Sequence, residues 1–243
     1  MKKEIKIICT LGPASLNKEF LKFSKNKISL LRLNMSHLSL NNLEKKIKFI
    51  KKHTNIPICI DTEGAQIRTK INKTRFCKNK TTLNIYKSNS NFVLYPDYIF
   101  SKLRVGDILK IGFNGLIVKI KSINREVIKS TVKHPGLLEN NKGVHVSNRK
   151  IKLNFLTDKD FEVIKIAKKF KINYYALSFT NSQKDIINFN KLLKNEIKIF
   201  KLETRLAIKN IEKILSLGDK FLIDRGDLSK DIPIEMIPVI QRK

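Results

Sequence analysis

The sequence of 243 residues has no tryptophan, only three cysteines and few acidic residues. Cys9, Cys59 and Cys77 are odd in number and lack the close spacing of a metal site, so they predict neither a disulfide framework nor a structural zinc site. No stretch approaches the ~20 consecutive apolar residues of a membrane-spanning helix, and the charged N-terminus has no apolar signal-peptide core. We therefore expect a cytoplasmic protein that does not interact with a membrane.

The shortage of acidic residues leaves the chain strongly basic. It has 50 lysine and arginine residues against 21 aspartate and glutamate residues, a net charge of +29. Such a balance is typical of nucleic-acid-binding proteins. However, 41 of the basic residues are lysines spread along the whole chain, and isoleucine and asparagine are abundant, which we interpret as compositional drift. Specific nucleic-acid binding is therefore the lowest-ranked hypothesis. The 42% content of hydrophobic residues is enough for a substantial folded core.

The most informative stretch runs from Ile197 to Asp227. The apolar run 197–200 leads to Lys201 and Glu203, a helical pattern follows, and the apolar run 221–223 leads to Asp227. The carboxyl ends of parallel strands meet at one edge of a sheet, and neighbouring strands lie ~4.8 Å apart. Glu203 and Asp227 can therefore share a hard cation, with Lys201 beside it to neutralise an anion. The alternative is an ordinary group of salt bridges between these residues and Arg225.

The same rhythm of an apolar run followed by polar residues occurs four more times. The runs are 5–9, 28–31, 56–60 and 174–177, and they lead to Thr10, Arg32, Asp61 and Ser178. Six strands with helical patterns between them predict an α/β fold, an incomplete TIM-type (β/α) barrel whose polar groups share one face.

The gap between Asp61 and Ser178 is too long for one strand–helix unit. It contains short alternating segments at 82–86, 107–111, 116–120 and 127–128, and Asn114-Gly115 is a tight-turn signal. We predict an inserted all-β lid domain at 70–150, between barrel segments at 1–69 and 151–243. The next barrel helix is expected to start after Thr157, which Asp160 completes as a capping box.

Several motifs together resemble pyruvate kinase, in order and over nearly the whole chain. They are 6–15 (KIICTLGPAS), 32–37 (RLNMSH), 61–69 (DTEGAQIRT), 141–144 (NKGV), 177–179 (LSF), 201–203 (KLE), 225–228 (RGDL) and 231–233 (DIP). Each is weak alone, but the set indicates homology.

The resemblance implies roles for individual residues. Arg32 would bind the substrate phosphate, Lys201 would stabilise the transition state, and Gly226 would meet the substrate through its backbone. Magnesium would be held by Glu203 and Asp227. The potassium ligands would be Asn34, Ser36, Asp61 and Thr62, and the nucleotide contacts would come from Arg68, Lys142, Asn34 and His37. We expect His37 to act as a structural hydrogen-bonding residue rather than a general base.

The chain also departs from the family pattern. Glu63, Ala65 and Gln66 stand where lysine, proline and glutamate are usual, and Gln66 leaves the potassium requirement open. Phe113-Asn114 stands where the lid normally carries paired aspartates. Asp224 replaces an alanine and places an extra charge near the metal.

The sequence ends at Lys243, just after the sixth strand. The family has two further barrel strands, one carrying a threonine that helps protonate the enolate, and a C-terminal effector domain. We expect this chain to self-associate or to need a second polypeptide.

Three hypotheses follow. The first is a pyruvate-kinase-type phosphotransferase that moves a phosphoryl group between phosphoenolpyruvate and ADP, giving pyruvate and ATP in glycolysis. The second is an inactive or partner-dependent relative that binds metal and phosphorylated ligands. The third is a basic nucleic-acid-binding protein.

Overall fold

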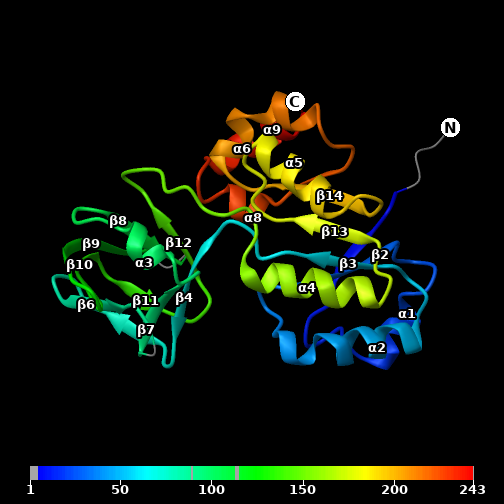
Figure 1. Cartoon of the computed structure of the whole chain (residues 1–243), viewed down its shortest axis with the longest axis horizontal. Coiled ribbons are helices and arrows are strands. Elements are labelled where there is room, and N and C mark those ends of the chain that lie inside the picture. Colours follow the sequence, from blue (N-terminus) through cyan, green and yellow to red (C-terminus); the bar gives the residue numbers. More distant parts are fainter. Residues whose placement is uncertain (1–4, 89, 113–114, 243) are drawn as a thin grey trace. The chain divides into compact units, whose positions relative to one another are not determined.

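The computed structural model describes residues 5–88, 90–112 and 115–242 (Figure 1). By its internal contacts the chain divides into two compact units. The first unit consists of Met1–Ala65 and Asn154–Lys243, and the second is Gln66–Leu153. The second unit thus lies between two parts of the first in the sequence. The domain boundaries predicted at 69/70 and 150/151 stay predictions.

A curled sheet of six parallel strands is the centre of the first unit (Figure 1). Its order in space is β1 (Ile8–Thr10), β2 (Leu30–Asn34), β3 (Ile58–Asp61), β13 (Tyr174–Leu177), β14 (Ile197–Leu202) and β15 (Phe221–Ile223). All pairs are parallel, so the polar residues that follow these strands lie along one edge. The register sets Asn34 of β2 opposite Asp61 of β3.

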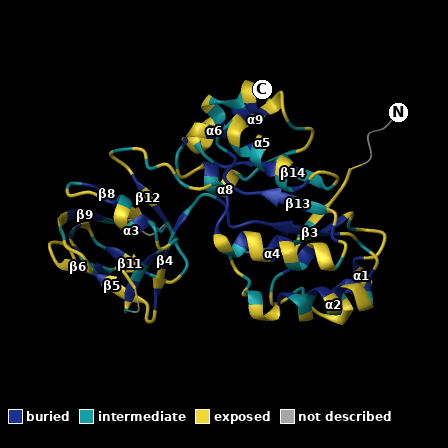
Figure 2. Ribbon diagram, viewed as in Figure 1, coloured by how far each residue is buried: buried dark blue, intermediate teal, exposed yellow. Residues whose placement is uncertain are grey.

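The helices between these strands are α1 (Lys18–Phe23), α2 (Leu43–His53), α4 (Asp158–Lys169), α5 (Gln183–Leu192), α6 (Arg205–Lys209) and α7 (Ile211–Leu215), with the 3₁₀ turn η1 (Leu40–Asn42). After β15 come α8 (Arg225–Leu228), the 3₁₀ turn η2 (Ile234–Met236) and α9 (Ile237–Arg242). Helix α2 buries Leu43, Ile47 and Ile50 and exposes lysines on its other face, as Figure 2 shows for the helix as a whole. The predicted capping box of Thr157 and Asp160 at the start of α4 is confirmed.

The helical pattern predicted between Glu203 and Gly218 is confirmed, but the helix is divided. The segment forms two short helices, α6 and α7, which meet at Asn210. Asn210 has φ −100° and ψ 13°, and its side-chain amide donates a hydrogen bond of 2.8 Å to the carbonyl of Asn181. Leu215 at the end of α7 is 40% exposed. The tertiary bond of Asn210 therefore overrides the helical periodicity.

The second unit contains a closed barrel of seven strands in the order β10-β6-β7-β4-β12-β8-β9, and a two-stranded sheet of β11 and β5. The strands are β4 (Ile67–Ile71), β5 (Arg75–Cys77), β6 (Thr82–Tyr86), β7 (Phe92–Tyr95), β8 (Ile108–Ile111), β9 (Leu116–Ile123), β10 (Val127–His134), β11 (Gly136–Leu138) and β12 (Gly143–Val146). The unit is not made of strands alone, since it also holds the short helix α3 (Ile99–Lys102). Strands β8 and β9 pair antiparallel, with Gly115 in the left-handed conformation (φ 78°) just before β9. Asn114, the other half of the predicted turn, lies outside the described residues.

Each unit has its own hydrophobic core. In the first, side chains from β2, β3, β13 and β14 pack with those of the surrounding helices, and in the second the inward residues of the seven-stranded barrel pack together. Figure 2 shows the parallel strands as largely buried. Within the described part of the chain, no helix is both long and apolar enough to span a bilayer.

Candidate active site

Lys201 lies at the centre of the polar edge of the parallel sheet. It comes from the end of β14, is 3% exposed, and its ammonium Nζ lies 2.7 Å from Glu203 and 3.3 Å from Asp61. Asp224 lies further away, at 3.6 Å. Burial alone would lower the pKa of Lys201, but the carboxylates of Asp61 and Glu203 raise it above its ordinary value. Lys201 is therefore a fixed positive charge inside a ring of carboxylates.

Arg32 shares the Asp61 carboxylate with Lys201. From β2, its Nε donates to Asp61 Oδ2 at 2.8 Å, Nη2 forms an ion pair with the same oxygen, and Nη1 donates to Thr10 Oγ1 at 2.9 Å. Ser178 connects the group further: its hydroxyl donates to Asp61 Oδ1 at 3.1 Å and lies 3.2 Å from Lys201 Nζ. The predicted anion-binding residues Arg32 and Lys201 thus converge on one buried carboxylate.

Glu203 is almost completely buried, with 2% exposure. Its Oε2 accepts a hydrogen bond of 2.5 Å from the backbone N–H of Phe179, and its Oε1 faces Lys201. Burial raises the pKa of Glu203 to about 7, because desolvation of the carboxylate outweighs the stabilising contacts with Lys201 and Phe179. A further cation beside Glu203 would compensate the charge of its carboxylate and so favour the ionised form.

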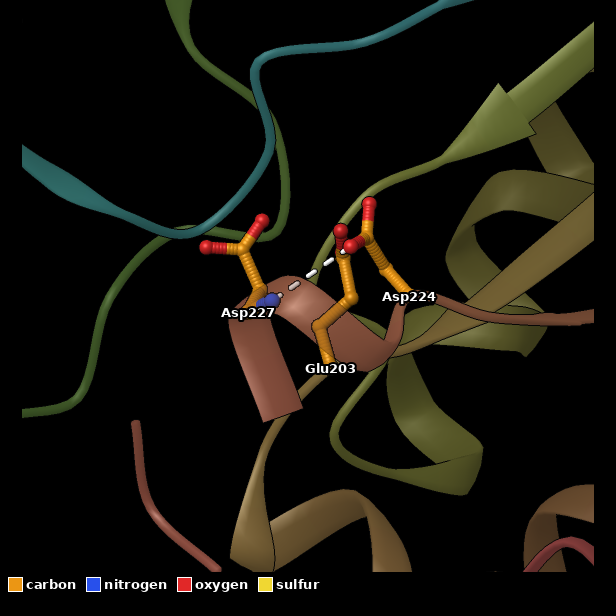
Figure 3. A group of neighbouring side chains, drawn as sticks. All are labelled: Glu203, Asp224 and Asp227. Carbon is orange, nitrogen blue, oxygen red and sulfur yellow. Dashed lines mark hydrogen bonds between the residues drawn. The ribbon is translucent and has the colours of Figure 1, made fainter. Parts of the chain in front are cut away.

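The carboxylates of Glu203, Asp224 and Asp227 lie close together (Figure 3). One ligand oxygen from each of Glu203, Asp224 and Asp227 lies within 4.8 Å of the others. Asp224 and Asp227 come from the start of α8, where Asp224 Oδ1 caps the helix by accepting from the N–H of Asp227 at 3.3 Å. Asp227 also forms an ion pair with Lys230.

Oxygen ligands of this type suit a hard divalent cation, so the donor set fits magnesium. The structure brings the predicted pair Glu203 and Asp227 together. Asp224 was expected only as an extra charge, and the sequence signal for it was its place directly after an apolar strand.

The predicted potassium ligands lie at the ends of β2 and β3. Asn34 Oδ1 accepts from the N–H of Ser36 at 3.0 Å, and Thr62 Oγ1 accepts from the N–H of Ser178 at 3.1 Å. Asp61 is engaged by Arg32, Lys201 and Ser178 at the same time. Asn34 and Asp61 are opposite one another in the register of β2 and β3, but Asp61 already has two cationic partners.

The predicted nucleotide contacts divide between the units. Arg68 and Lys142 lie in the second unit, where Arg68 is paired in register with Gly143, the neighbour of Lys142. Arg68 Nη1 donates to the carbonyl of Asn141 at 3.3 Å, and Lys142 pairs with Glu139 at 3.5 Å. Gln66 lies against Gly143, since a Cβ on that glycine would come 2.9 Å from its Nε2.

Asn34 and His37 lie in the first unit, and the N–H of His37 donates to the carbonyl of Asn34 at 3.2 Å. Gly226 lies in α8, beside the carboxylate group. Phe113-Asn114, the departure in the lid, lies outside the described residues.

Asp160 anchors the chain where it leaves the parallel sheet. Its buried carboxylate accepts from the N–H groups of Glu63 at 2.7 Å, Gly64 at 3.1 Å and Thr157 at 3.0 Å. Burial raises the pKa of Asp160 against the effect of these three donors. Gly64 has φ 67°, and a Cβ there would lie 2.4 Å from the carbonyl oxygen of Ser178. Only glycine therefore fits this close approach between the ends of β3 and β13.

Glu63, an acidic residue where the family pattern has lysine, has a structural partner. Its Oε1 lies 2.7 Å from Lys159 Nζ, and its Oε2 accepts from the Thr157 hydroxyl at 3.1 Å. The reversed charge is thus compensated by a neighbouring lysine within the same unit.

A curled parallel α/β sheet with a lysine and carboxylates at its carboxyl edge places the chain among α/β proteins whose site lies at the strand ends. Comparison of the sequence with known protein families identifies the family within this class. The family model described as "Pyruvate kinase, barrel domain" matches residues 2–243, and the chain belongs to the pyruvate kinase family.

Similar proteins include pyruvate kinases of Staphylococcus epidermidis, 30% identical over 99% of this chain and 44% of theirs, and of Thermotoga maritima, 27% identical over 99% of this chain and 55% of theirs. Plastidial pyruvate kinase 3 of Arabidopsis thaliana is 28% identical over 100% of this chain and 45% of its own length. The chain spans about half the length of the curated relatives it matches.

Proposed function

We propose that the chain is the (β/α)-barrel part, with its inserted lid domain at about 70–150, of a phosphotransferase of the pyruvate kinase type acting in glycolysis. In this reaction the phosphorus–oxygen bond of phosphoenolpyruvate breaks, a new bond forms to the terminal phosphate oxygen of ADP, and the remaining enolate takes up a proton to give pyruvate. The observation that supports the proposal most directly is the buried Lys201 among Asp61, Glu203 and Asp224, with Arg32 beside it.

In this proposal Lys201 and Arg32 bind and orient the phosphoryl group. Transfer spreads negative charge over the phosphoryl oxygens, so fixed cations at hydrogen-bond distance lower the barrier. Because Asp61 already holds both side chains in place, little reorganisation is needed when the substrate arrives. The backbone at Gly226 offers a contact to the carboxylate end of the substrate without steric hindrance.

Glu203 and Asp227 would hold magnesium, with Asp224 as a neighbouring oxygen donor. Such an ion, when bound, neutralises charge on the phosphoryl and enolate oxygens. Asn34, Ser36, Asp61 and Thr62 are proposed as the potassium site, with the requirement for potassium left to experiment. The nucleotide contacts proposed for Arg68, Lys142, Asn34 and His37 complete the assignment.

One observation favours a second candidate, an inactive relative that binds metal and phosphorylated ligands. Asp224 Oδ2 lies 3.6 Å from Lys201 Nζ and competes with an anionic substrate for that ammonium. An added negative charge at this position would weaken phosphoenolpyruvate binding and transfer by electrostatic repulsion.

A coupled assay for pyruvate, with magnesium and potassium present, tests the proposal on the 243-residue chain. We expect turnover, of the chain by itself or with a second polypeptide that completes the barrel, to be lost in Lys201→Met, which keeps most of the side-chain volume but removes the charge. Lys213→Met, a change at an exposed lysine of α7, is the matched control. Turnover that survives Lys201→Met would refute the assignment. Binding of phosphoenolpyruvate without turnover would support the second candidate instead.

A further inference from the structure

The second unit has a hollow of about 440 Å³ that the proposed reaction does not use. It is formed by β5 and β6 with the residues that follow them, and it shares no residue with the proposed nucleotide contacts Arg68 and Lys142. Its lining is Arg75, Phe76, Cys77, Lys78, Thr81, Thr82, Leu83, Asn84, Tyr86 and Asn91.

The charged side chains that line the hollow are all cationic. Among the described residues that line it, the ionisable groups besides Cys77 and Tyr86 are Arg75 and Lys78, and none is a carboxylate. Among the described residues neither cation forms an ion pair. The segment 66–153 as a whole has 19 lysine and arginine residues against four aspartate and glutamate residues. An anion is therefore the ligand that this surface attracts.

Aromatic side chains accompany the cations. Phe76 is 60% exposed and pairs in register with the half-exposed Leu137 of β11. Along β6, Leu83 and Ile85 are buried in the core of the unit, whereas Thr82, Asn84 and Tyr86 are exposed or half-buried and line the hollow together with Leu83. Phe76 and Tyr86 line the same hollow, and each offers an aromatic surface on which a planar group can stack.

We infer that the hollow binds a nucleotide through its base and its phosphate. Phe76 and Tyr86 would stack on the base, and Arg75 and Lys78 would pair with the phosphate. The nucleotide could be free or part of a single-stranded nucleic acid, since both carry the same groups.

The test uses the full chain with two probes, AMP by calorimetry and a fluorescent single-stranded oligoadenylate of about ten nucleotides by anisotropy. Phe76→Ala should weaken binding about 10-fold, because one stacking contact is lost. Arg75→Gln should lower the slope of log K against log salt for the oligonucleotide by about 0.7, because one phosphate contact is lost. Lys110→Gln and Lys121→Gln, exposed lysines of the same unit outside the hollow, are the matched controls.

Binding of AMP that depends on Phe76 and Arg75 would identify a free nucleotide as a ligand, and binding of the oligonucleotide alone would identify a nucleic-acid strand. Equal losses in the lysine controls would overturn the inference, since they would reveal diffuse charge attraction only. Failure of both probes to bind would also overturn it. The pyruvate assay is independent of this result, because the hollow contains none of the proposed catalytic residues.

Discussion

Glu203 makes a sharp prediction about the pH dependence of stability. Its pKa is about 7 in the folded chain, against 4.5 for an ordinary glutamate. The folded state therefore holds a proton between pH 4.5 and 7 that the unfolded state has released. By linkage, the stability that Glu203 contributes is fully present below pH 4.5 and is lost as the pH rises through 7. At ~1.4 kcal/mol per pKa unit, the loss amounts to about 3 kcal/mol.

The measurement is urea unfolding of the wild type and of Glu203→Gln in steps from pH 4.5 to 8, without divalent cations. Glutamine is neutral throughout, so the variant should gain about 3 kcal/mol of unfolding free energy relative to the wild type over this range. The ion pair with Lys201 forms only when Glu203 is ionised, and its effect is already contained in the pKa of about 7, so it adds nothing further to this slope. Glu212→Gln, at an exposed position of α7, controls for the exchange itself. Stability curves of Glu203→Gln and wild type that run parallel across the range would refute the reasoning.

Three further predictions concern the same edge of the sheet. Asp227→Asn should weaken magnesium binding by ~10-fold or more, measured by calorimetric titration, because one hard oxygen ligand loses its charge; an unchanged titration would remove Asp227 from the site. Arg32→Ala should cost ~2–4 kcal/mol in phosphoenolpyruvate affinity or in kcat/KM, since a charged hydrogen bond to the phosphate is lost; a wild type that phosphoenolpyruvate neither binds nor protects from heat would contradict it. Asp160→Ala should destabilise the chain by about 3 kcal/mol or more, read from thermal unfolding, because three backbone donors lose their acceptor; a loss below about 1 kcal/mol would show that water replaces the carboxylate.

The sequence was sufficient for the parallel strands and for the residues at their ends, because each strand is an apolar run with a polar group directly after it. Lys201, Glu203 and Arg32 could be placed in this way, since strand position alone decides which edge they reach. The division of the helix at Asn210 could not be predicted, because its cause is a hydrogen bond to Asn181, 29 residues earlier in the chain.

The ion pairs and the hydrogen bond of Asp61 could not be predicted from the sequence either. Two cations from different strands and the Ser178 hydroxyl converge on it, and only the register of β2, β3, β13 and β14 reveals this. The hollow beside Phe76 could not be predicted from the sequence, for a related reason. Its residues read as ordinary alternating strands, and their shared surface depends on how β5 and β6 pack.

Asp160 accepts hydrogen bonds from the two chain segments that lead into and out of the second unit. Glu63 and Gly64, just before residue 66, and Thr157, just after residue 153, are all bonded to this single carboxylate of the first unit. The ends of the 88-residue segment are thus fixed by the parallel-sheet unit itself. Because loop-closure entropy grows only slowly with length, replacing the segment by a short flexible linker changes that entropy little. For this reason the segment from Gln66 to Leu153 can be removed, shortened or exchanged by protein engineering.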